Sequence, residues 1–179
     1  VPDIPLYRPP PAPFVAPGRL FAVQVPSGWG VALHDRDPYT IDFRAADRPG
    51  EAVIQVRRML VPSGAHPRQL MLNAIEQRLR KLPNFKVIMR RDILVAGGKG
   101  ASVLGSYAYQ GNIQFPRVVE EVYMVLGNEA FVLHFECFEP AAAAFALDLE
   151  RFYGSFQPRP PAEMPFGRAE PEQGSEIPF

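Results

Sequence analysis

Proline is distributed so unevenly along this chain that it limits where regular structure can form. Seven prolines fall in residues 1–17 and six in residues 158–179, out of 21 in the whole chain. Proline lacks a backbone donor and has a fixed φ, so it is excluded from helix interiors and central strands. We therefore expect one folded domain at residues 19–157, with extended proline-rich arms at residues 1–18 and 158–179.

Both predicted arms carry apolar side chains that a solvated linker does not need. They could pack along the domain or bind a partner, and a stiff proline-containing segment loses less entropy on docking than a flexible one. We expect the arms to contribute partner-binding residues at Leu6, Tyr7, Phe14, Phe166 and Phe179.

Between the arms, period-two alternation and turn residues predict eight strands. Short turns between successive strands indicate an antiparallel sheet. The expected strands are Leu20–Val25, Val31–His34, Tyr39–Phe43, Ala52–Met59, Phe85–Val95, Ala101–Tyr109, Val118–Leu126 and Ala130–Phe138.

Two segments have the 3.6-residue period of one-sided helices. The first follows Pro67 and ends before Pro83, with an apolar stripe at Leu72, Ile75, Leu79 and Leu82. The second begins at Pro140 and carries an apolar face of Ala142, Phe145, Leu149, Phe152 and Phe156. The sequence therefore predicts an α+β fold, in which two main helices sandwich an antiparallel β-sheet.

The runs Val118–Leu126 and Ala130–Phe138 flank Gly127-Asn128-Glu129, which predicts a tight hairpin. Alternation across this hairpin places Glu121 and Tyr123 on the same face as His134 and Glu136. Glu121, His134 and Glu136 could bind a divalent metal, or the carboxylates could keep His134 protonated. The alternative is a solvated or helix-covered polar patch.

Charge is balanced overall but is separated along the chain. The net charge is zero, which argues against a nucleic-acid binder. Residues 51–110 hold ten Lys and Arg against three acidic residues, whereas residues 111–179 hold four against eleven. Such a chain could dock electrostatically, with a basic surface at Arg57, Arg58, Arg90 and Arg91, or the two halves could offset each other across an ordinary polar surface.

No catalytic constellation is visible in the sequence. Cys137 falls on the face of its strand that carries Phe131, Leu133 and Phe135, where a thiol is a small buried hydrophobe. The run from Gly97 to Gly100 precedes a strand rather than a helix, so it predicts a hairpin turn and not a phosphate loop. We expect no enzyme activity and no cofactor.

Trp29 and Phe43 are expected to pack in an aromatic core, although a sheet and a helix could separate there to hold an apolar ligand.

The segment Phe21–Trp29, FAVQVPSGW, resembles the opening of PsbP-like domains, and Val122–Phe156 is similar to their closing hairpin and helix. The resemblance covers residues 19–157 and extends to DcrB-like proteins. It implies an antiparallel sheet sandwiched by helices that serves protein binding rather than catalysis. Members include an extrinsic subunit of the oxygen-evolving complex, a nuclear binder of the Ran GTPase and cytoplasmic chaperones of secreted toxins. The two proline-rich arms depart from that pattern.

These observations favour a non-catalytic accessory subunit or assembly module that docks on a larger protein complex, with no transmembrane segment and with membrane-peripheral placement as one option. The start at Val1 rather than at a methionine favours a processed protein of the periplasm or cell envelope. The alternatives are a carrier or sensor of a small apolar ligand or metal ion, and a cytoplasmic binder that resembles secretion chaperones.

Overall fold

The computed structural model describes residues 11–45, 52–82, 84–111 and 114–161. Its strands are β1 (Ala12–Val15), β2 (Phe21–Val25), β3 (Trp29–His34), β4 (Asp37–Ala45), β5 (Ala52–Leu60), β6 (Lys86–Val95), β7 (Gly98–Ala108), β8 (Pro116–Leu126), β9 (Glu129–Phe138) and β10 (Gln157–Pro158). Its helices are α1 (Pro67–Lys81) and α2 (Ala146–Ser155), with short 3₁₀ turns η1 (Pro17–Arg19), η2 (Tyr109–Gly111) and η3 (Glu139–Phe145).

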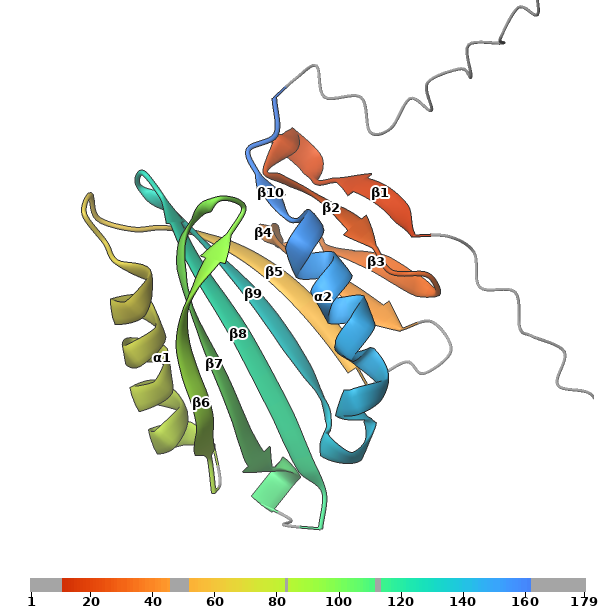
Figure 1. The fold of residues 1–179 in the computed structure, drawn as a ribbon, viewed down its shortest axis with the longest axis vertical. Coiled ribbons are helices and arrows are strands. Elements are labelled where there is room, and N and C mark those ends of the chain that lie inside the picture. The colour runs from red at the N-terminus through yellow and green to blue at the C-terminus, as the bar shows by residue number, and fades with distance from the viewer. Residues whose placement is uncertain (1–10, 46–51, 83, 112–113, 162–179) are drawn as a thin grey trace, which may run out of the picture.

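The strands form two antiparallel sheets (Figure 1). The larger has seven strands in the order β3-β4-β5-β9-β8-β7-β6, and the smaller has the order β1-β2-β10. Helix α1 packs on β6, β7 and β8, whereas α2 packs on β2 of the small sheet. The predicted α+β sandwich, with a helix on either side of an antiparallel sheet, is confirmed.

The main core lies between the large sheet, α2 and the small sheet. Phe43, Phe131 and Phe135 of the large sheet face Phe152 of α2 and Phe156, and each is at most 1% exposed. Their rings meet at tilted or edge-on angles. The centroids of the Phe43 and Phe152 rings, for example, lie 5.0 Å apart. This packing confirms the predicted apolar face of the second helix and the core placement of Phe43.

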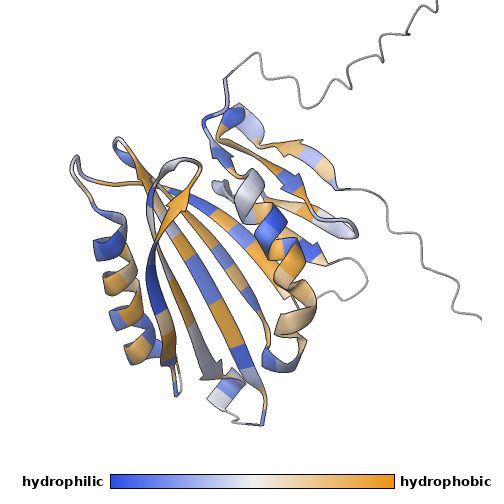
Figure 2. Cartoon of the chain, in the orientation of Figure 1, coloured by the Kyte–Doolittle hydropathy of each residue, from blue (hydrophilic) through white to orange (hydrophobic). Residues whose placement is uncertain are grey.

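Alternation along the strands places polar residues on the opposite face of the large sheet. Figure 2 shows bands of hydrophilic residues among hydrophobic ones along β8. Helix α1 covers part of this face with Met71 and Ile75, which pack on Val103, Tyr123 and Val132. The side of the face that lies over β4 and β5 has no helix packed on it among the described elements.

Strand β2 does not join the other predicted strands in the large sheet. Phe21, Ala22 and Val23 are all at most 1% exposed, so this strand is buried on both faces between β1 and β10. Ala22 is small enough to be covered, and the Gln24 N–H donates to Ser155 Oγ of α2 at 2.9 Å. The predicted strand exists, but it belongs to the small sheet.

The inner ends of both predicted arms belong to the fold. Strand β1 pairs with β2 across Phe14 and Val23, and Pro13 is accommodated because β1 is an edge strand. Phe14 packs edge-on against Phe43 at 5.5 Å between ring centroids. The prediction of an arm outside the core is therefore wrong for Ala12–Val15, because these residues pair with β2 and Phe14 packs, partly buried, against the aromatic core.

The predicted stripe of the first helix is also partly wrong. Leu79 is 57% exposed, and the line that faces the sheet runs through Met71, Ile75 and Arg78 instead. The helix begins as expected at Pro67, with the His66 ring accepting from the Arg68 N–H, and ends at Lys81, with Leu82 as its C-cap.

The hairpin turns follow the sequence closely. Ala96 and Gly97, both with positive φ, join β6 to β7, which confirms a hairpin rather than a phosphate loop. Cys137 is buried in the main core, and burial raises the pKa of its thiol to about 11. Within the described part of the chain, no helix has the length and apolar character needed to cross a membrane.

Candidate functional site

A row of polar residues crosses the face of the large sheet on which α1 packs. Asp42, Gln55, His134 and Glu121 lie opposite one another on β4, β5, β9 and β8. The Gln55 side chain donates to Asp42 at 2.8 Å, and His134 Nδ1 lies 2.9 Å from Glu121 Oε1. The predicted grouping of Glu121, Tyr123, His134 and Glu136 on one face is confirmed.

Glu121 is the centre of this network and is fully buried. Arg57 donates to its Oε1 at 3.1 Å, Arg78 pairs with the same oxygen, and the Tyr123 hydroxyl donates to Oε2. Burial alone would raise the pKa of Glu121, but the hydrogen bond from His134 and the charge of Arg78 outweigh it and lower the pKa to about 2. Glu121 is therefore a carboxylate at neutral pH.

His134 lies between two carboxylates. Its Nε2 is 3.3 Å from Glu136 Oε2, while its Nδ1 faces Glu121. Burial would lower the pKa of His134, but the hydrogen bonds to Glu121 and Glu136 raise it above the ordinary value. This geometry matches the predicted alternative in which carboxylates hold the imidazole protonated.

Glu136 has two further partners on neighbouring strands. The Tyr107 hydroxyl donates to its Oε1 at 2.6 Å, and Arg117 forms an ion pair with the same oxygen. Burial opposes ionisation, but the hydrogen bonds from His134 and Tyr107 lower the pKa of Glu136 to about 2. Arg117 is itself held over the Phe138 ring, 4.7 Å from its centroid.

The three residues predicted as alternative metal ligands are brought together but are matched by cations. Glu121, His134 and Glu136 form ion pairs with one another and with arginines. Over the residues that the structure describes, no group of three or more His, Cys, Asp or Glu is arranged to hold a metal ion. Metal binding at this position stays a prediction.

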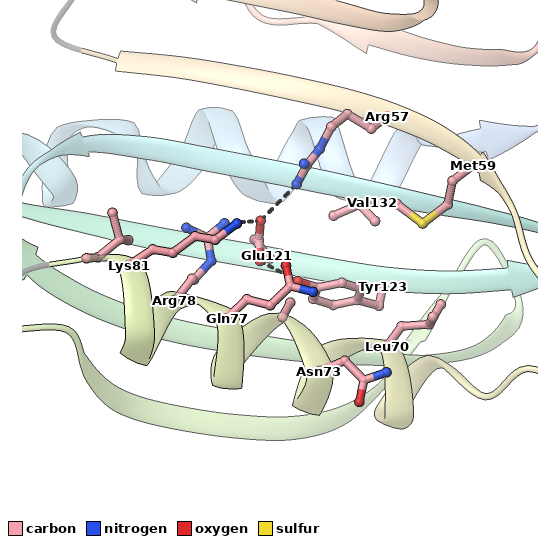
Figure 3. A pocket seen from close by; sticks show the side chains of 12 residues that line it. Arg57, Met59, Leu70, Asn73, Gln77, Arg78, Lys81, Glu121, Tyr123 and Val132 are labelled. Atoms are coloured by element: carbon pink, nitrogen blue, oxygen red, sulfur yellow. Dashed lines mark hydrogen bonds and ion pairs between the residues drawn. The ribbon is translucent and has the colours of Figure 1, made fainter.

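A pocket of about 430 Å³ opens beside Glu121, between α1 and strands β5, β8 and β9 (Figure 3). Arg57 of β5 and Arg78 of α1 point toward Glu121 from either side, and Lys81 lies next to Arg78. Met59, Leu70 and Val132 line the other end. The pocket is therefore cationic at one end and apolar at the other.

The structure separates the residues predicted to bind a partner. Arg57 pairs with Glu121, and Arg58 pairs with Glu129 and lies over the Tyr39 ring, so both are engaged within the fold. Arg90 and Arg91 are exposed on the edge strand β6. Phe14 is partly buried against the main core, while Leu6, Tyr7, Phe166 and Phe179 lie outside the described residues.

Sequence reasoning missed Arg78, Tyr107 and Arg117 as members of the network. One signal could have found Arg78, because it continues the line of Met71 and Ile75 at helical spacing, which an arginine does only if it meets a buried acid. Tyr107 and Arg117 lie opposite each other on β7 and β8. Their roles depend on pairing between strands that the sequence does not specify.

The comparisons with known proteins give a fold and no sequence relative. No family model matches the chain, and the search of curated proteins found no match. Several solved structures are similar to it over most of both chains, among them the three described next. LpqN of Mycobacterium tuberculosis, described as involved in cell envelope biogenesis, has 17% identity and a TM-score of 0.57, covering 85% of this chain and 87% of LpqN.

The other two structures come from different lineages. Cyanobacterial PsbP from Synechocystis has 10% identity and a TM-score of 0.60, covering 82% of this chain and 91% of that chain. The Ran-binding protein Mog1p of Saccharomyces cerevisiae has 10% identity and a TM-score of 0.64, covering 86% and 97%. Such identities carry the fold alone. The domain therefore has the PsbP-like fold that its opening and closing segments resemble.

Proposed function

We propose that this chain is a non-catalytic accessory module that docks on a protein partner, within a larger complex, through the basic surface of α1 and β6. One observation carries the proposal. Outside the pocket beside Glu121, five exposed Lys and Arg residues lie on these two elements against two acidic residues, Glu76 and Asp92; the five are Arg68, Arg80, Lys86, Arg90 and Arg91. A surface with such an excess of one sign steers and orients an acidic partner.

The cations on this surface are available to a partner. Arg90 and Arg91 are exposed, and Arg68 and Arg80 each meet one acid, Asp92 and Glu76, at positions open to solvent. Exposed ion pairs of this kind contribute little, so a partner can replace them at low cost. By contrast, the segment from η3 to the end of α2 carries three acidic residues and one arginine.

The state of the polar network supports a binding role rather than catalysis. Both ring nitrogens of His134 face carboxylates, and Glu121 and Glu136 accept several donors each. A general acid or base must have a proton position free for the substrate, and here each position already has an internal partner. We therefore assign the network to structure and to the shaping of the pocket.

The similar structures favour an accessory role in more than one setting. Mog1p is a Ran-binding protein, and LpqN is involved in cell envelope biogenesis. We place this module outside the cytoplasm, in the periplasm or cell envelope at a membrane-associated complex. Its proline-rich segments 1–10 and 162–179 would add contacts with the same partner, through Leu6, Tyr7, Phe166 and Phe179.

The test is charge reversal on the proposed surface. The variant Arg80→Glu/Arg90→Glu changes α1 and β6, while the matched control Arg36→Glu/Arg151→Glu reverses two exposed cations elsewhere. Chemical cross-linking in cells of the native source, followed by quantitative mass spectrometry, measures the partners of each. We expect the first variant to lose the partners of the wild type and the control to keep them. Equal recovery by both variants would refute the docking surface.

A further inference from the structure

The pocket beside Glu121 has a shape and polarity that docking on α1 and β6 does not use. It opens on the side of α1 that carries Leu70, Asn73 and Gln77, whereas β6 lies along the side that carries Arg68 and Leu72. Its volume of about 430 Å³ lies within the range of about 300–1,000 Å³ that small-molecule sites occupy. Its inner wall is formed by Glu121 and Tyr123, which are buried.

The charges around the inner end of the pocket do not balance. Two carboxylates, Glu121 and Glu136, face five cations: Arg57, Arg78, Lys81, His134 and Arg117. Glu136 pairs with Arg117 and shares His134 with Glu121, so the two carboxylates leave three of the five positive charges without a matching negative charge. A cationic end of this kind is completed by an anion, because partly buried charges favour a partner of opposite sign.

Two of these cations have unused donors. Lys81 makes no ion pair or hydrogen bond with the residues that the structure describes, although it lines the pocket. The Nε of Arg57 is buried and has no hydrogen-bond partner there. An arginine that approaches Glu121 with one nitrogen keeps others for a second acceptor.

The far end of the pocket is mostly apolar, with the amide of Asn73 beside Leu70. Met59, Leu70 and Val132 line it, and the ring of Tyr123 lies between them and the cations (Figure 3). Methionine and leucine give a wall that adapts to a flexible hydrocarbon chain, and burial of that chain is favourable in proportion to its area. The pocket lining is therefore cationic at the inner end and mainly hydrocarbon at the far end.

We propose that the pocket binds a small organic carboxylate with a hydrocarbon chain, whose head group is held by Arg57, Arg78 and Lys81 and whose chain lies along Met59, Leu70 and Val132. Arg57 and Arg78 bind the carboxylate while they keep their contacts to Glu121, and Lys81 closes the site from the end of α1. The protein is then a carrier or sensor of such an anion, in addition to its docking role.

Decanoate is the probe, below its micellar concentration, and three analogues separate head group from chain. Acetate has the charge without the chain, decanol has the chain without the charge, and decyltrimethylammonium has the opposite charge. Isothermal titration calorimetry should give one decanoate per protein chain and at least about tenfold weaker binding of each analogue. Native mass spectrometry of the full chain checks the stoichiometry.

Lys81→Glu is the informative variant because Lys81 is exposed and has no internal partner to lose among the described residues. It should weaken decanoate binding by about tenfold or more, whereas Arg80→Glu, one residue away and outside the pocket lining, should change it by less than about threefold. Met59→Asp should weaken it at the other end of the pocket. Thermal unfolding of each variant confirms that it is folded.

Three results would overturn the proposal: absence of decanoate binding, equal binding of decanoate and decyltrimethylammonium, or equal loss in Lys81→Glu and Arg80→Glu. Binding of an acidic peptide at this pocket without decanoate binding would also refute it and would extend the protein interface instead. The cross-linking test of the α1–β6 surface is independent, since decanoate binding and partner recovery can each fail alone.

Discussion

The two faces of the large sheet use the same alternating strands for opposite purposes. The face against α2 and the small sheet is closed by aromatic rings, among them Phe43, Phe135 and Phe152. The face against α1 carries a row of charged and amide side chains, with Glu121 fully buried beneath a helix that covers only part of it. Buried charge is costly to hold, so the second face adds less to stability than its area suggests.

That difference indicates where selection could act on function. An aromatic core fixes the fold and tolerates little change in volume, whereas a charged pocket over a half-covered face can be altered without loss of the fold. We call the face against α2 and the small sheet the dry face, and the face against α1 the polar face. This difference between them would be contradicted if a substitution on the dry face cost no more stability than one on the polar face.

The largest effect is expected from Phe152→Ala on the dry face. Phe152 is fully buried and its ring meets those of Phe43 and Tyr153. Its removal leaves a cavity, and we expect the free energy of unfolding to fall by about 4 kcal/mol, measured by urea denaturation. Leu147→Ala on the exposed side of the same helix is the control, with a change below about 0.5 kcal/mol. A loss below about 1 kcal/mol for Phe152→Ala would show that α2 is not the main closure of this face.

The closing hairpin and the second helix are the parts of the fold that the sequence predicts well. Alternation in β8 and β9 assigns each residue to a face, and the short turn at Gly127 and Asn128 fixes the register that places Glu121 opposite His134. The second helix is also predicted by the helical spacing of its apolar residues, although α2 begins at Ala146 and not at Pro140, because residues 139–145 form a 3₁₀ turn. Local pattern and tertiary packing agree at these positions.

A smaller effect is expected from Glu121→Gln on the polar face. The amide keeps the size of the side chain but leaves Arg57, Arg78 and His134 without their shared anion. We expect a loss of about 3 kcal/mol of unfolding free energy, the usual consequence of removing one partner from a buried charge network. Glu76→Gln is the control, since Glu76 pairs with Arg80 in solvent and should contribute below about 0.5 kcal/mol. Equal effects of the two substitutions would show that burial does not decide the energetics of this face.

The polar face was only partly predictable. Glu121, His134 and Glu136 follow from one hairpin, but Arg57 and Arg78 come from β5 and α1, which reach Glu121 across 64 and 43 residues. Alternation says which face a residue occupies and not which distant strand lies beside it. The small sheet was missed for the same reason. The pairing of β2 with β1 and β10 joins a strand that we predicted to be part of the large sheet with segments that we predicted to be proline-rich arms.

The smallest effect is expected from deprotonation of His134. Its pKa is raised by Glu121 and Glu136, so the protonated ring stabilises the fold fully below the ordinary value of 6.5, and this contribution is lost as the pH rises through the folded pKa. Each unit by which the pKa is raised is worth about 1.4 kcal/mol.

At the acid end the sign is reversed. Glu121 and Glu136 have pKa values lowered to about 2, so their contribution is present above the ordinary value of 4.5 and lost as the pH falls toward 2. Unfolding free energy measured against pH should therefore be highest between about 4.5 and 6.5 and should decline on both sides. In His134→Gln, the decline on the alkaline side should disappear while the decline below 4.5 remains, because arginines still pair with both carboxylates. Two results would contradict this prediction: a wild-type curve that stays flat through neutral pH, or an unchanged alkaline decline in His134→Gln. Either result would mean that the imidazole is neutral between its two carboxylates. The excess positive charge beside the pocket would then be smaller by one.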